Sequence, residues 1–109
     1  MVKHDIEIPT KEWLADFCER HRVHKLSFFG SFTRDDFGPE SDIDVLVEFQ
    51  PEAGVGFFEL FDMEDELSAL MGGRRVEINT PNSLSKYFRD EVLAEAEEAY
   101  VEAARARRG

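Results

Sequence analysis

The sequence predicts an α/β (α+β) domain in which helices pack on a small mixed β-sheet. Apolar residues recur at helical spacing in three segments, and three shorter apolar segments have the length and composition of buried strands. These segments follow the order helix, strand, turn, strand, helix, strand, helix, which is typical of helices packed on one sheet. With 109 residues, 42% of them hydrophobic, we expect residues 1–109 to form a single domain with one core.

The first helix is expected to begin after Thr10, a residue suited to the N-cap, and to continue to about His21. Its apolar positions recur every three or four residues, and they are Trp13, Leu14, Phe17 and Cys18. Residues 25–29 then have the pattern of a short buried strand, which ends at Gly30.

The middle of the chain predicts a turn, a strand and a loop. Residues 31–34 are expected to begin a helical turn, and residues 42–49 form the second strand. Residues 50–56 contain the Pro and Gly residues of a loop, after which an apolar stripe predicts a long helix up to residue 71.

The last third of the chain predicts one more strand and one more helix. Gly72 and Gly73 end the long helix, and residues 75–80 are the third strand. A turn at residues 80–83 precedes a helix that we expect to continue past residue 100. The apolar face of that helix is Phe88, Val92, Ala96, Ala99, Tyr100 and Ala103.

Two carboxylates interrupt the second strand. Asp42 and Asp44 share one face of this strand, while Ile43 and Val45 face the core. Two ionised carboxylates near an apolar core repel each other unless a cation lies between them. Because oxygen atoms are the only ligands at this spacing, a hard ion such as Mg²⁺ fits best.

The pattern Asp-x-Asp is short, and it has an ordinary structural alternative. Asp42 could cap a turn after Ser41, and Asp44 could be a surface charge at the strand edge. The Gly30–Ser31 pair at the end of the preceding strand favours a functional site instead, because a small residue admits a phosphate and a following helical turn offers N–H groups to it. Together the two features predict a nucleoside triphosphate bound through Mg²⁺.

Glu77 supplies a third carboxylate, because it points away from the side chains of Val76 and Ile78 in the third strand. If this strand pairs beside the Asp-x-Asp strand, Glu77 can reach the same site and complete the trio of acids used in two-metal nucleotidyl transfer. Alternatively, Glu77 pairs with Arg74 or Arg75 at the surface.

The charge balance bears on partners and location. A net charge of −11 repels a phosphate backbone, so free nucleic acid is a poor partner and a basic protein surface is a better one. The N-terminal residues have no apolar leader pattern, and no window approaches eighteen uncharged apolar residues, so we expect neither secretion nor membrane insertion. The single cysteine, Cys18, is consistent with a reducing cytoplasm.

The motif Gly-Ser, ten residues, Asp-Ile-Asp resembles the signature of the DNA polymerase β-like nucleotidyltransferase superfamily. The resemblance extends from FGSFTRDDFGPESDIDVLVEF through the third-strand VEI to the closing helix, which is nearly the whole chain. Within that superfamily the sequence resembles the minimal nucleotidyltransferases, the MntA-type antitoxins encoded beside HEPN-domain toxins. This resemblance implies a nucleotidyltransferase fold.

The resemblance also implies roles for individual residues. Asp42 and Asp44 would hold Mg²⁺, and Glu77 would be the third acid, where an aspartate is more common in the family. The residues implied in holding the nucleotide phosphates or in shaping the loop are Gly30, Ser31, Arg34 and Ser41.

By the same resemblance, the expected activity is the Mg²⁺-dependent transfer of AMP from ATP to a tyrosine hydroxyl of a HEPN-type ribonuclease toxin. The first alternative is a binding module that neutralises its partner by covering it. The second is a small-molecule nucleotidyltransferase of the aminoglycoside-modifying type, which ranks lower because that class carries an additional helical substrate domain.

Overall fold

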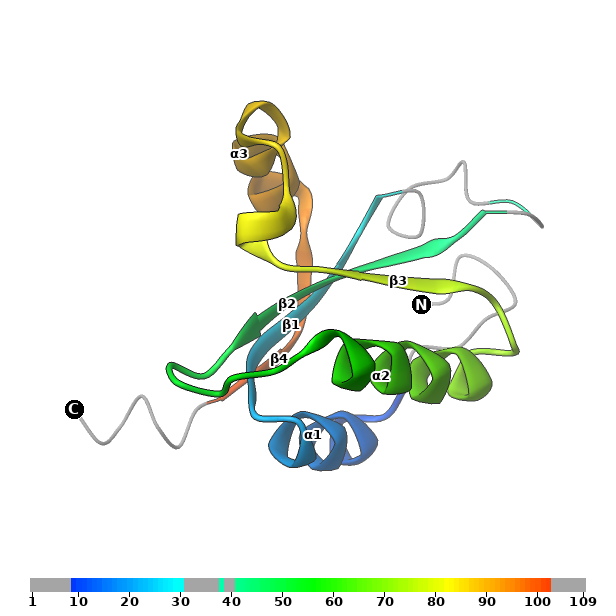
Figure 1. Cartoon of the computed structure of the whole chain (residues 1–109). Coiled ribbons are helices and arrows are strands. Elements are labelled where there is room, and N and C mark those ends of the chain that lie inside the picture. The colour runs from blue at the N-terminus through cyan, green and yellow to red at the C-terminus, as the bar shows by residue number, and fades with distance from the viewer. Residues whose placement is uncertain (1–8, 31–37, 39–40, 103–109) are drawn as a thin grey trace.

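The structure is a computed structural model that describes residues 9–30, 38 and 41–102. Figure 1 shows the chain from blue at the N-terminus to red at the C-terminus. In chain order, the elements are α1 (Lys11–Arg20), β1 (Val23–Phe29), β2 (Ile43–Phe49), α2 (Phe57–Leu70), β3 (Val76–Asn79), the 3₁₀ turn η2 (Pro81–Ser83), α3 (Lys86–Glu95) and β4 (Glu97–Val101).

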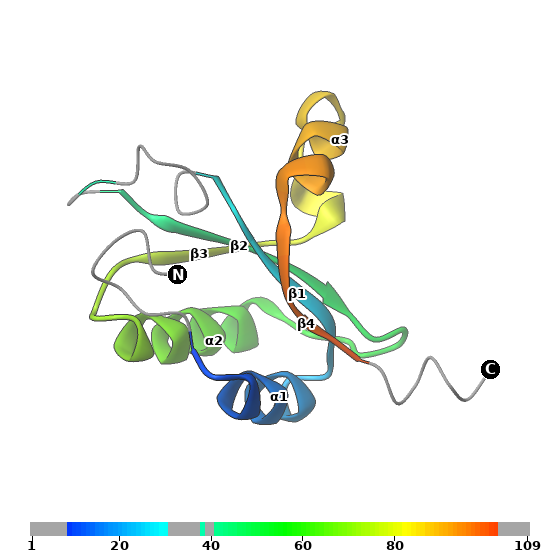
Figure 2. The same ribbon diagram turned by 180° about the vertical axis from the view of Figure 1, so that it is seen from behind.

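The strands of the described part form a four-stranded mixed sheet in the order β3-β2-β1-β4. β1 pairs antiparallel with both β2 and β4, whereas β2 pairs parallel with β3. α1 packs on β1 and β4, α2 packs on β3, and α3 projects from the opposite side of the sheet (Figures 1 and 2). The predicted class, a small mixed sheet packed with helices, is confirmed.

The N-terminus of α1 and the C-terminus of α2 are formed by the residues that the sequence predicted. The Thr10 side chain accepts a hydrogen bond from the Trp13 backbone N–H at 3.1 Å, so it is the N-cap of α1. After α2, Gly72 and Gly73 have φ angles of +78° and +79°, and the Gly73 N–H donates to the Ser68 carbonyl at 2.8 Å. A left-handed glycine with such a backward bond ends a helix.

The core lies between the sheet and the two helices α1 and α2. Cys18 belongs to it as the sequence predicted, and burial raises the pKa of its thiol to about 12. The Trp13 and Phe17 rings stack with their centroids 5.0 Å apart. The fully buried residues of the core include Phe17, Val23, Leu26, Ile43, Val45, Val47, Met63 and Leu67.

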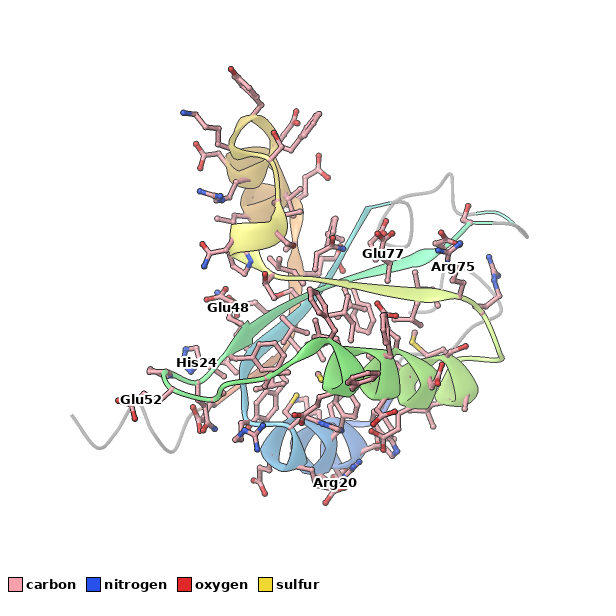
Figure 3. The ribbon with its side chains drawn as sticks, viewed as in Figure 1. Arg20, His24, Glu48, Glu52, Arg75 and Glu77 are labelled. Carbon is pink, nitrogen blue, oxygen red and sulfur yellow. The ribbon has the colours of Figure 1, made fainter. Side chains whose placement is uncertain are left out.

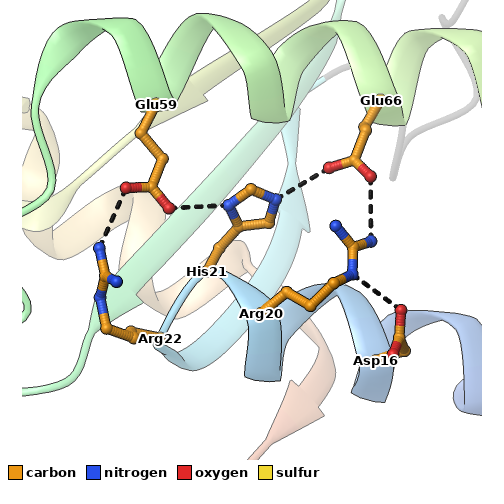
Figure 4. A network of polar contacts seen from close by, with 6 residues as sticks. All are labelled: Asp16, Arg20, His21, Arg22, Glu59 and Glu66. Atoms are coloured by element: carbon orange, nitrogen blue, oxygen red, sulfur yellow. Dashed lines mark hydrogen bonds and ion pairs between the residues drawn. The ribbon is translucent and has the colours of Figure 1, made fainter.

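A polar network joins α1 to α2 beside this core (Figure 4). His21 contacts two carboxylates of α2, with Nδ1 2.9 Å from Glu59 and Nε2 2.8 Å from Glu66. The flanking arginines bind the same two carboxylates: Arg20 donates to Glu66 and Arg22 donates to Glu59.

The prediction for the end of the chain was wrong in one respect. The last helix ends at Glu95 instead of continuing past residue 100, and residues 97–101 form the strand β4. Ala99 and Tyr100, assigned to a helical face, are half-buried against the core from this strand. A longer α3 would bury little apolar surface, since α3 itself has no buried residue. As a strand, β4 instead pairs with the backbone N–H and C=O groups along the edge of β1.

None of the helices in the described part of the chain is long and apolar enough to cross a membrane.

Candidate active site

Gly30 lies where β1 ends beside the start of β2. In the antiparallel register of these strands Phe29 is opposite Asp44, which brings the next residue, Gly30, against the Asp44 side chain. A Cβ atom at Gly30 would lie 3.2 Å from Asp44 Cγ and closer still to its Oδ2. Gly30 also has a φ of +74°, a conformation that side chains of L-residues disfavour. The Asp44 carboxylate thus occupies space that only glycine leaves open.

The pairing of β2 with β3 brings Glu77 to the same place. In the parallel register Asp44 is opposite Glu77, and directly opposed residues of neighbouring strands project from the same face of the sheet. Glu77 is exposed and points away from α2, toward the side of the sheet from which α3 projects (Figure 3). The condition under which Glu77 could join the site, pairing of the third strand beside the Asp-x-Asp strand, is therefore met.

Asp42 lies just before β2, at the end of a tight turn. In this turn the Ser41 N–H donates to the Gly38 carbonyl at 3.1 Å, and the Ser41 Oγ accepts from the Gly38 N–H at 3.0 Å. After Asp42, the Ile43 N–H donates to the Arg75 carbonyl at 2.9 Å. The Ser41 hydroxyl therefore closes the turn that precedes the carboxylates.

Two of the predicted nucleotide-binding residues, Ser31 and Arg34, lie outside the described residues. Their placement at the phosphates stays a prediction from the sequence.

The donors fit a hard divalent cation. Asp42 and Asp44 offer carboxylate oxygens two residues apart in the sequence, and the Asp44 carboxylate lies directly against Gly30. Within residues 9–30, 38 and 41–102, no three His, Cys, Asp or Glu side chains are grouped as a cation site. The fit thus rests on the aspartate pair, with Glu77 as a neighbour of Asp44.

The contacts of Arg74 differ from the alternative drawn from the sequence, in which Arg74 is a surface partner of Glu77. The Arg74 guanidinium instead donates from Nη2 to the backbone carbonyls of Gly38 and Ser41, at 2.6 Å each. Among the described residues Glu77 forms no ion pair with Arg74 or Arg75. No signal in the spacing could have revealed Arg74, because backbone carbonyls are the same at every position.

Comparison with known proteins decides the family. The model of the family described as nucleotidyltransferase domain matches residues 11–99, which is most of the chain. The chain belongs to the nucleotidyltransferase domain family. This finding confirms the resemblance inferred from the motif.

Sequence relatives of this nucleotidyltransferase domain are named as protein adenylyltransferases. It is 36% identical over 77 residues to the candidate protein adenylyltransferase MJ0435 of Methanocaldococcus jannaschii, covering 71% of this chain and 80% of that protein. It is 32% identical over 77 residues to the protein adenylyltransferase MntA of Thermococcus cleftensis, covering 71% of this chain and 75% of that protein.

Solved structures support the fold of the nucleotidyltransferase domain. A candidate minimal nucleotidyltransferase superimposes with a TM-score of 0.66 at 31% identity, covering 79% of this chain and 85% of the other. The complex of an MNT antitoxin with a tri-AMPylated HEPN toxin from Shewanella oneidensis matches with a TM-score of 0.60 at 12% identity, covering 89% of this chain and 74% of the other. At that identity the second similarity shows the fold alone.

Proposed function

We propose that this nucleotidyltransferase domain is a Mg²⁺-dependent protein adenylyltransferase that transfers AMP from ATP to a tyrosine hydroxyl of a HEPN-type toxin and so acts as its antitoxin. The observation that carries the proposal is that the Asp44 carboxylate lies directly against Gly30, so the Gly-Ser pair and the Asp-x-Asp strand meet at one place. The names of the sequence relatives support the choice of a protein as acceptor.

Each site residue has a role in this reaction. Gly30 and Ser31 admit the triphosphate, Arg34 and Ser41 assist in holding it or in shaping the loop, and the remaining roles fall to three carboxylates. These are Asp42 and Asp44 as ligands of Mg²⁺ and Glu77 as third acid. Mg²⁺, when bound, neutralises charge on the phosphates and on the leaving pyrophosphate.

The transfer balances as a single displacement at phosphorus. The tyrosine oxygen forms a bond to the α-phosphorus, the bond from that phosphorus to the bridging oxygen of the pyrophosphate breaks, and pyrophosphate leaves with the electron pair. The hydroxyl proton passes to a carboxylate, for which the exposed Glu77 beside Asp44 is suited. The products are AMP-tyrosine and pyrophosphate.

The surface of the molecule supports a protein partner. Phe57, Phe58 and Tyr87 are 77%, 87% and 86% exposed, and aromatic side chains are enriched in protein–protein interfaces. The net charge of −11 complements a basic partner. Such an acceptor would bring its own binding surface to a domain that has little room for a separate substrate pocket.

The test uses the chain co-expressed with a HEPN-type protein, the proposed partner. Incubation with ATP and Mg²⁺ should add AMP units to the partner, seen by intact-protein mass spectrometry, with peptide mapping to a tyrosine. The variant Asp42→Asn/Asp44→Asn and a sample with excess EDTA should both leave the partner unmodified. If the wild-type protein binds the partner but never modifies it, the non-catalytic binding module is the correct function.

A further inference from the structure

Arg74 connects the loop before β3 to the turn before the carboxylate pair. Its Nη2 donates to the carbonyl oxygens of Gly38 and Ser41, at 2.6 Å each. These are the two residues whose mutual hydrogen bonds close the turn, so one cation caps both of its ends. Asp42 follows Ser41 directly in the chain.

The same loop also holds the residue on the other side of Asp42. The Arg75 carbonyl accepts the Ile43 N–H at 2.9 Å, which fixes the first residue of β2. The residues on both sides of Asp42 are therefore held by this loop: Ser41 by the Arg74 guanidinium, and Ile43 by the backbone carbonyl of Arg75.

We propose that Arg74 is a positioning residue for the Asp42–Asp44 carboxylate pair. Two like charges held close together tend to separate, and a flexible turn would let Asp42 move away from Asp44. A turn fixed in advance keeps the two carboxylates in place, so that binding of Mg²⁺ and nucleotide does not have to order them. This inference rests on the proposed function for the site itself.

The hydrogen bonds from Arg74 to the two carbonyls are of a strong type. Hydrogen bonds from a guanidinium are charge-assisted, which makes them shorter and roughly twice as strong as neutral ones. Arg74 is half-buried, so water competes less for these carbonyls than it would at the surface. Arg75 offers a matched control, because its side chain is exposed and its bond to Ile43 comes from the backbone alone.

The experiment compares Arg74→Met with Arg75→Met, which remove the same charge and keep a side chain of similar length. Isothermal titration calorimetry with AMP-PNP and Mg²⁺ measures binding without any acceptor. We expect Arg74→Met to raise the Kd at least about tenfold, the effect of losing one charge-assisted hydrogen bond or more. Arg75→Met should stay within about twofold of the wild type, as a surface substitution does.

A conservative variant separates positioning from general stability. Arg74→Lys keeps the charge and N–H donors, so it should recover part of the lost affinity. If Arg74→Met does not fold, Arg74→Gln and Arg75→Gln are compared by the same criterion. Folded Arg74 variants that bind Mg²⁺ and AMP-PNP as tightly as their Arg75 counterparts would overturn the proposal.

A second measurement needs no nucleotide. Hydrogen exchange of the Ser41 and Ile43 amides, which donate within this segment, should be about tenfold faster or more in Arg74→Met and unchanged in Arg75→Met. Equal exchange in the two variants would overturn the positioning role. If the wild-type protein fails to bind Mg²⁺ and AMP-PNP, the proposed function fails, yet faster exchange in Arg74→Met alone would still show that Arg74 holds this segment.

Discussion

At the scale of single residues, Gly30 has a close match elsewhere in the chain. Gly30 and Gly72 have nearly the same φ, +74° and +78°, but only a Cβ at Gly30 would meet Asp44; at Gly72 no described atom lies within 4 Å. Both Gly→Ala substitutions should therefore cost about 1–2 kcal/mol of unfolding free energy for the left-handed backbone. Chemical denaturation measures this shared cost.

Only Gly30→Ala should also affect the site. Because the new methyl group displaces the Asp44 carboxylate, we expect the Kd for AMP-PNP in the presence of Mg²⁺ to rise about tenfold or more, while Gly72→Ala binds as the wild type does. Equal affinity in the two variants would show that Asp44 does not hold the nucleotide complex.

Glu77 distinguishes an enzyme with a third acid from one that uses the aspartate pair alone. The side chain is exposed and forms no ion pair within the described residues, so Glu77→Ala should change the unfolding free energy by less than about 0.5 kcal/mol. If Glu77 accepts the hydroxyl proton, kcat should fall about a hundredfold or more while nucleotide affinity changes little. Glu77→Asp should retain or raise activity, and an unchanged kcat in Glu77→Ala would remove Glu77 from the mechanism.

Residue chemistry was predictable from the sequence where it depends on side chains and spacing. The Asp-x-Asp pattern and the Gly-Ser pair predicted one site at Gly30 and Asp44, and side-chain alternation added Glu77 on the condition that the third strand pairs beside the second. The strand registers place Phe29, the residue before Gly30, and Glu77 opposite Asp44. Arg74 was not predictable, since its partners are backbone carbonyls of a turn whose path only the folded chain defines.

At the scale of elements, the contact between α1 and α2 depends on pH through Glu66. Burial alone would raise the pKa of Glu66, but hydrogen bonds from His21 and Arg20 outweigh it and lower the pKa below its usual value of 4.5. A lowered folded-state pKa contributes stability above the unfolded value, and this stability is lost as the pH falls through the folded-state pKa.

We therefore expect Glu66→Gln to destabilise the protein near neutral pH and to differ less from the wild type as the pH falls below about 4.5. Urea unfolding across this range measures the difference. Asp65→Asn is the matched control, because it removes one charge from an exposed position of the same helix without an ion pair among the described residues. A difference between Glu66→Gln and the wild type that does not change with pH would contradict this account.

The end of the chain shows why element boundaries are harder to predict than elements. The sequence after Glu95 is rich in Ala and Glu, which favour helix, and its apolar spacing continues the pattern of α3. What decides the outcome is the open edge of β1, a partner that the local sequence does not contain.

The two tyrosines test this boundary. Tyr100 is opposite Leu26 in the sheet and packs against the core, whereas Tyr87 on α3 is 86% exposed. Tyr100→Ala should cost about 2 kcal/mol of unfolding free energy, part of the cost of truncating a fully buried aromatic residue. Tyr87→Ala should cost less than about 0.5 kcal/mol. Similar costs in thermal or urea unfolding would mean that β4 does not add to the fold.

At the scale of the whole molecule, the layering of the fold restricts how an acceptor approaches. α1 and α2 cover the face of the sheet that carries Ile43 and Val45, so Asp44 and Glu77 lie on the other face, from which α3 projects (Figures 1 and 3). The sequence predicted helices packed on the sheet but not which helices lie on which face, because that depends on where α3 turns away from the core.

If the proposed transfer takes place at these carboxylates, the most direct approach for the acceptor hydroxyl is on the side of α3. Tyr87 and Phe58 form a matched pair, because they are 86% and 87% exposed and belong to α3 and α2, two helices on opposite sides of the sheet (Figures 1 and 2). If a protein acceptor docks over the carboxylates, truncating an aromatic residue at its edge should raise the KM for that acceptor, about tenfold for a residue of the interface. Tyr87→Ala should show this increase with unchanged affinity for AMP-PNP, and Phe58→Ala should not. The opposite result would mean that the acceptor is held on α2 and reaches the carboxylates around the edge of the sheet.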